Sequence, residues 1–114
     1  MQKFLRLNAT TKADRHLAIE SVKEAIAYGG GWILDFKLFS NLSALISFEL
    51  PQENLVTFQD ALSKIGLQLN EASSQAIHDL TDQQTAPAEI SATLQITFIH
   101  NEPDLRIPVP MIPG

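Results

Sequence analysis

The 114-residue sequence contains no cysteine, which excludes disulfide bonds, thiolate nucleophiles, cysteine-ligated zinc and iron–sulfur clusters. It also lacks long apolar runs, and a membrane-spanning helix needs about 20 predominantly apolar residues in a row. The amino terminus, MQKFLRLNAT, has no apolar stretch of the kind that a secretory signal requires. These absences predict a cytoplasmic protein with no membrane partner.

Positive charge is scarce as well. Lys and Arg number 8 against 13 Asp and Glu, which gives a formal net charge of −5 at pH 7, and the basic residues form no run. Binding to a phosphate backbone needs a basic field. We therefore expect no nucleic-acid partner.

Motifs for cofactors and catalysis are missing. The sequence has no Walker loop, no dinucleotide-binding fingerprint and no G-x-S-x-G elbow. Its histidines, His16, His78 and His100, are far apart and have no metal-ligand spacing. We expect no cofactor and no metal site, and the balance leans away from an enzyme.

The glycine run at 29–31 is the one place where a phosphate-binding loop could be sought. Such a loop needs a strand first and a helix after it, whereas here a helical pattern precedes the glycines and a strand pattern follows them. Glycine directly after the last periodic residue is a common helix stop signal. We therefore expect Gly29 to end a helix, and Gly30 and Gly31 to let the chain reverse.

Alternation and periodicity indicate the first elements. The segment KFLRLN at 3–8 is typical of a strand, and residues 12–28 carry a single apolar stripe at helical spacing. Thr11 is expected to cap this helix, with Asp14 completing a capping box in place of the usual Glu.

The segments WILDFKLF and ALISFEL predict a β-hairpin. Its loop should have an odd length, so that both apolar faces lie on one side of the sheet. A loop at 41–43 places Asp35 opposite Glu49, and a loop at 41–45 places Lys37 there instead. Opposed like charges favour the longer loop and turn statistics allow the shorter one. The residues expected on the apolar faces are Trp32, Leu34, Phe36, Leu38, Ala44, Ile46, Phe48 and Leu50.

The second half of the chain is less regular. Residues 52–66 predict a second helix, and 67–73 a short strand. The region after it is polar and broken by proline, with at most a helical turn near 75–80. Residues 91–100 predict a last strand, and the tail at 103–114 is rich in proline.

The order strand–helix–strand–strand–helix–strand is typical of the ferredoxin-like, or split βαβ, pattern. It predicts an α+β two-layer sandwich, in which two helices cover one face of an antiparallel sheet and one extra strand is added. We expect residues 1–102 to form a single domain. Residues 103–114 would form an extended tail, packed on that domain or on a partner subunit.

The open face of this sheet carries the best candidate ligand site: Arg6, Asp35, Lys37 and Glu49. Arg6 and Lys37 could hold an anion while the two carboxylates set its orientation. The alternative is a face that is solvated, or covered by self-association, since antiparallel sheets often have one polar face.

A second candidate lies at the start of the first helix, where Thr11, Arg15 and His16 cluster. Free N–H groups at a helix start bind phosphate or carboxylate groups. The alternative is a capped helix start with exposed cations. Asp14 favours that alternative because it already neutralises this end.

Two functions remain on this evidence. The first is a small non-catalytic regulatory or binding module, dimeric, that recruits a protein partner or senses a small anionic metabolite. The second is a small α+β enzyme that uses Asp35 and Glu49 with Arg6 or Lys37. A sheet edge that starts at Trp32 favours a homodimer.

Overall fold

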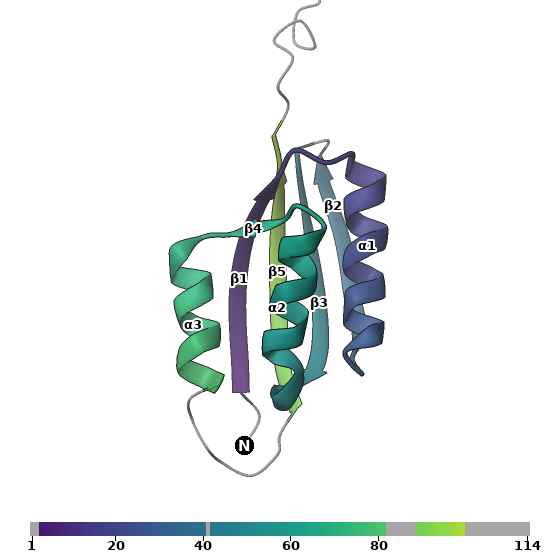
Figure 1. Cartoon of the computed structure of the whole chain (residues 1–114). Coiled ribbons are helices and arrows are strands. Elements are labelled where there is room, and N and C mark those ends of the chain that lie inside the picture. The colour runs from purple at the N-terminus through teal and green to yellow at the C-terminus, as the bar shows by residue number, and fades with distance from the viewer. Residues whose placement is uncertain (1–2, 41, 82–88, 100–114) are drawn as a thin grey trace, which may run out of the picture.

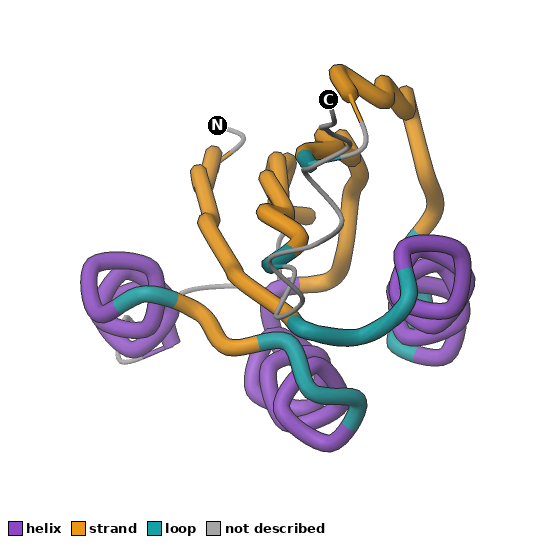
Figure 2. Tube along the Cα trace, turned by 90° about the horizontal axis from the view of Figure 1, so that it is seen from above, coloured by secondary structure: helices purple, strands orange, loops and turns teal. Residues whose placement is uncertain are grey.

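The computed structural model describes residues 3–40, 42–81 and 89–99. They form one five-stranded sheet with α-helices on one of its faces, so the fold is α+β (Figures 1 and 2). The proline-rich tail at 103–114 lies outside the described residues. In chain order the elements are β1 (Lys3–Thr11), α1 (Arg15–Tyr28), β2 (Trp32–Ser40), β3 (Ser43–Pro51), the 3₁₀ helix η1 (Gln52–Asn54), α2 (Leu55–Lys64), β4 (Gln68–Leu69), α3 (Glu71–Thr81) and β5 (Glu89–Phe98).

The strands lie in the order β2-β3-β5-β1-β4. β5 is parallel to β1 and antiparallel to β3, while the β2–β3 and β1–β4 pairs are antiparallel. The sheet is therefore mixed, and the prediction of an antiparallel sheet was wrong. The ferredoxin-like arrangement is not confirmed, because both β3 and β5 separate β1 from β2.

A third helix explains the changed order. α3 was expected to be a single turn at most, but it is 11 residues long and runs from the β4 end of the sheet back toward the start of β1 (Figure 1). This additional reversal lets β5 run in the same direction as β1. Asn70 begins the helix, since its Oδ1 accepts from the Ser73 backbone N–H at 2.8 Å, and Ile77 buries its inner face.

The first helix starts later than its sequence pattern predicts. Thr11 is the last residue of β1, and its Oγ1 accepts from the Ala13 N–H at 3.1 Å. Asp14 is the N-cap, and its Oδ2 accepts from the Leu17 N–H at 3.2 Å. The expected capping box is wrong because the shorter carboxylate of Asp14 caps the helix directly.

The glycine run is a helix end, as expected. The Gly31 N–H donates to Ile26 O at 2.9 Å and the Gly30 N–H to Ala27 O at 3.0 Å, which is the Schellman pattern. Gly30 has a φ of 83°, a left-handed conformation that favours glycine. Asn54, just before α2, fastens this corner because its Nδ2 donates to Gly29 O at 2.6 Å.

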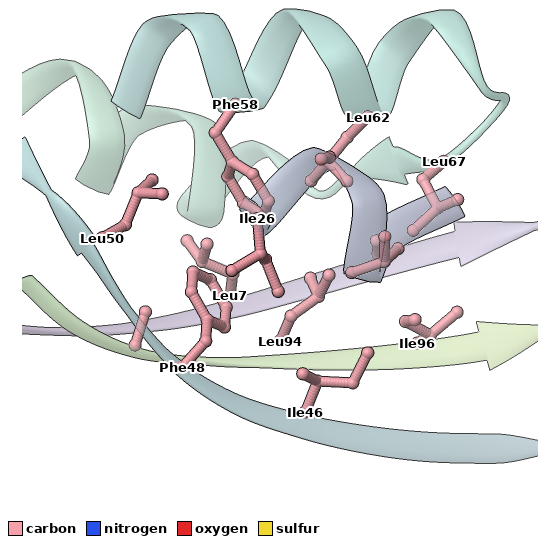
Figure 3. Close-up of a cluster of buried hydrophobic side chains, with 14 of the residues drawn as sticks. Leu7, Ile26, Ile46, Phe48, Leu50, Phe58, Leu62, Leu67, Leu94 and Ile96 are labelled. Carbon is pink, nitrogen blue, oxygen red and sulfur yellow. The ribbon is translucent and has the colours of Figure 1, made fainter. Parts of the chain in front are cut away.

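The core lies between the sheet and the helices (Figure 3). Phe48 of β3 and Phe58 of α2 meet at its centre, with ring centroids 5.2 Å apart. The expected stripes on α1, α2 and β5 all face it. The largest fully buried side chains are Leu7, Ile26, Ile46, Phe48, Leu50, Leu55, Phe58, Leu62, Ile77, Ile90, Leu94 and Ile96.

The β2–β3 hairpin has neither of the two predicted registers. Ser40 pairs with Ser43, so the strands approach each other closely at the turn, and irregularities lie between Ile33 and Asp35 and between Leu38 and Ser40. Between these irregularities the pairs again place apolar residues opposite each other, as the parity argument requires. The loop length was wrong because a bulge adds a residue to one strand and shifts every pair beyond it.

Candidate functional site

The edge strand β2 carries an unusual set of exposed apolar side chains. It forms one side of the sheet and pairs only with β3. Of its residues only Ile33 is half-buried; the others are exposed, on both faces of the strand. We call this strand, with the turn residue that follows it, the β2 edge. Its large exposed apolar side chains are Trp32, Leu34, Phe36, Leu38, Phe39 and Leu42.

The course of β2 explains this exposure. The strand begins beside the end of α1 and then turns away from the helical layer (Figure 2). Bulges increase the local twist of a strand, and β2 has an irregularity near each end. The helices therefore leave Phe36 and Leu38 exposed, although register places both on the helix side, opposite Ile46 and Ala44.

One helix residue reaches the exposed part of β2. The Lys23 Nζ of α1 lies 5.6 Å from the centroid of the Phe36 ring, a cation–π contact. The same ammonium forms an ion pair with Glu20 at 3.4 Å. This contact adds charge to the rim of the β2 edge and leaves the Phe36 ring 38% exposed.

The four residues of the first predicted site share the open face of the sheet, but they do not converge. Asp35 faces Ser47, and Arg6 lies in the same row on β1, so three strand spacings of about 4.8 Å each separate them. Lys37 and Glu49 lie in other rows, opposite Leu45 and Trp32. Neither of the predicted opposite pairs with Glu49 forms.

Arg6 and Glu49 each have a contact with a neighbouring residue of the sheet. The Arg6 guanidinium lies 5.6 Å from the centroid of the Phe4 ring on its own strand. Glu49 accepts a hydrogen bond from the Ser91 hydroxyl at 3.2 Å. Asp35 and Lys37 remain together on β2, two residues apart on its open face. The structure thus spreads the anion-binding set across the sheet and leaves one pair at its edge.

The second predicted site lies at the start of α1. Thr11 is buried in β1, while Arg15 and His16 are the first two residues of the helix. The Asp14 carboxylate already accepts the Leu17 N–H. An anion would therefore meet a negative charge at this helix start.

A hollow of about 440 Å³ lies where β1 meets β4. Polar residues such as Asn8, Thr10 and Gln68 line it. Glu71 is the only ionisable residue among the described residues that line it, so the hollow offers no acid–base pair. Among all the residues that the structure describes, no group of three His, Asp or Glu residues could hold a metal ion.

Comparisons with protein-family models, with curated proteins and with solved structures found no match to the chain. Within residues 3–40, 42–81 and 89–99, no helix combines the length and the apolar character needed to cross a membrane. Among the described surfaces, the β2 edge has the most exposed large apolar side chains.

Sequence reasoning identified Asp35 and Lys37 on this strand but missed its exposed apolar residues. It placed Trp32, Leu34, Phe36 and Leu38 on the core face of the sheet. A signal was present: Ile33 and Phe39 stand at positions expected on the polar face of the strand. In the structure Trp32 and Ile33 have exchanged faces, since Trp32 pairs with Glu49 on the open face and the half-buried Ile33 pairs with Phe48 on the helix side. A strand that is apolar on both faces needs cover on both, and a two-layer fold provides cover on only one.

Proposed function

We propose that the chain is a non-catalytic protein-binding module that adds a strand of its partner to the β2 edge. The observation that carries the proposal is this nine-residue edge strand with exposed apolar side chains on both faces. Strand addition uses the free backbone groups of an edge for affinity and its side chains for specificity.

The apolar surface supports a protein partner over a small metabolite. Exposed apolar groups that lie together usually mark interaction sites. Trp32 is 48% exposed and Phe39 is 58% exposed, and aromatic residues are enriched among those that dominate binding energy. A strand laid beside β2 would bury such side chains on both of its faces.

The charged groups offer less support for a metabolite sensor or an enzyme. Three strand spacings separate Arg6 from Asp35, and Glu49 accepts a hydrogen bond from Ser91. A compact anion needs its cations on one side within hydrogen-bonding distance. The spacing of these side chains favours a solvated open face.

The test is a selection of peptides from a random display library on the immobilised chain. We expect the enriched peptides to carry apolar residues at every second position. Leu38→Lys should weaken their binding at least about tenfold, because a buried leucine side chain contributes about 1.5–3 kcal/mol. Val56→Lys is the matched control: Val56 is also apolar and exposed, but it lies on α2.

Equal binding to wild type and to Leu38→Lys would overturn the proposal. A small anion that raises the melting temperature saturably, and no longer does so in Arg6→Ala, would overturn it in favour of metabolite sensing. A panel of carboxylates, sugar phosphates and nucleotides in a thermal-shift assay is the probe for that outcome.

A further inference from the structure

We infer that the strand bound by the β2 edge is the β2 edge of a second copy of this chain, paired antiparallel about Phe36. The inference rests on the proposed function, because it names the partner of the same edge. The two five-stranded sheets would then form one continuous sheet across a two-fold axis.

Charge complementarity selects this register. With Phe36 opposite its own copy, Asp35 of each copy faces Lys37 of the other, which makes two cross-strand ion pairs. Opposite charges directly across a strand pair stabilise it and like charges destabilise it. Both residues are exposed on the open face of β2.

The neighbouring symmetric registers fail on the same criterion. A pairing centred on Asp35 places two aspartates opposite each other, and a pairing centred on Lys37 does the same with two lysines. Shifts by one residue would set open-face residues against helix-side residues. Among these registers only the one centred on Phe36 pairs opposite charges and keeps the helices of both copies on one face.

The local geometry of β2 fits this centre. From Asp35 to Leu38 the strand pairs with β3 without interruption, and its irregularities lie on either side of that stretch. The centre of the proposed pair is therefore regular strand. The two Phe36 rings would meet at the axis, an arrangement that aromatic pairs favour.

Edge charges usually protect a sheet against pairing with other strands, and lysine is the commonest of them. Here Lys37 would disfavour pairing with any strand that has no acidic residue opposite it. A second copy brings Asp35 to that position. The same two residues would thus discourage unrelated strands and favour the chain itself.

The test is sedimentation equilibrium on the full chain at about 1–300 µM, with charge reversals at the predicted pair. We expect a wild-type dimer, and a dissociation constant at least about tenfold weaker for Asp35→Lys and for Lys37→Asp, because each single change creates two like-charge pairs. The double variant Asp35→Lys/Lys37→Asp restores both pairs with the charges exchanged. Its dissociation constant should lie within about threefold of wild type.

Cysteine crosslinking tests the axis independently, since the chain has no native cysteine. Residues directly opposite in an antiparallel pair have Cα atoms about 4.5–5.5 Å apart, within the range that a disulfide spans. Phe36→Cys should therefore form a covalent dimer on mild oxidation. Ser40→Cys is the matched control: Ser40 is the last residue of β2, so an antiparallel pair about Phe36 holds it far from its own copy.

A wild-type chain that stays monomeric at the highest concentration overturns the inference. The inference is also overturned if the single charge reversals leave the dissociation constant unchanged, or if the double variant does not restore the wild-type value. If the chain is monomeric and still binds library peptides through Leu38, the self-pairing is wrong and the proposed function stands. Loss of peptide binding as well would contradict both.

Discussion

The two strands of the β2–β3 hairpin are similar in composition and opposite in burial. Each has nine residues and several large apolar side chains. β3 buries alternate residues completely, including Ile46 and Phe48, whereas β2 has one half-buried residue and none fully buried. β3 has a strand on each side and helices above it, while β2 has one neighbour and turns away from the helices. Burial is thus set by a strand's place in the sheet as much as by its pattern.

The largest expected effect comes from matched truncations in the two strands. Phe48→Ala removes a fully buried ring that packs against Phe58, and we expect it to lower the free energy of unfolding by about 3–5 kcal/mol. Phe36→Ala should lower it by less than about 1 kcal/mol in dilute monomer, because that ring is exposed. Urea unfolding followed by circular dichroism measures both. Similar losses would show that β2 is covered in solution.

A smaller effect is expected where the hairpin begins. A Cβ at Gly31 would overlap the backbone O of Glu49 on β3, so Gly31→Ala should lower the free energy of unfolding by about 1–3 kcal/mol. Gly29→Ala is the control, since its added Cβ would approach the flexible end of the Leu50 side chain at 3.0 Å. Thermal unfolding should rank the two variants in that order. The reverse order would contradict the close approach of the two strands.

The smallest expected effect concerns the contact between α1 and the exposed part of β2. Lys23→Gln removes the cation–π contact with Phe36 and the ion pair with Glu20, and should cost less than about 1 kcal/mol. Lys23→Arg should retain most of the stabilisation that these two contacts provide. Because exposed ion pairs are screened, part of the loss should disappear in 0.5 M salt. A loss above about 2 kcal/mol would mean that this contact holds β2 in place.

Local features of the fold could be read from the sequence. The stripe of α2, the alternation of β3 and β5, and the glycine corner at Gly30 all depend on neighbouring residues, and the structure confirms them. The order of the strands could not be read in the same way. It depends on α3, whose short apolar stripe around Ile77 gave a weak helical signal.

The candidate site was predicted in part. Placement of Asp35 and Lys37 on the open face was correct, because alternation fixes faces wherever a strand is regular. Their partners across the hairpin were wrong, because no single residue type marks the irregularities of β2. The exposure of Phe36 depends on the path of the whole strand relative to the helices, and alternation alone carries no information about that path.

The sheet's other edge differs from β2. There β4 is only two residues long and pairs with Ala9 and Thr10, while α3 lies beside β1 (Figure 1). Short edge strands resist further pairing. If a second copy occupies the β2 edge, as inferred above, we expect the described part of the chain to resist further strand addition at this other edge. Growth should stop at a pair and not continue into a fibre.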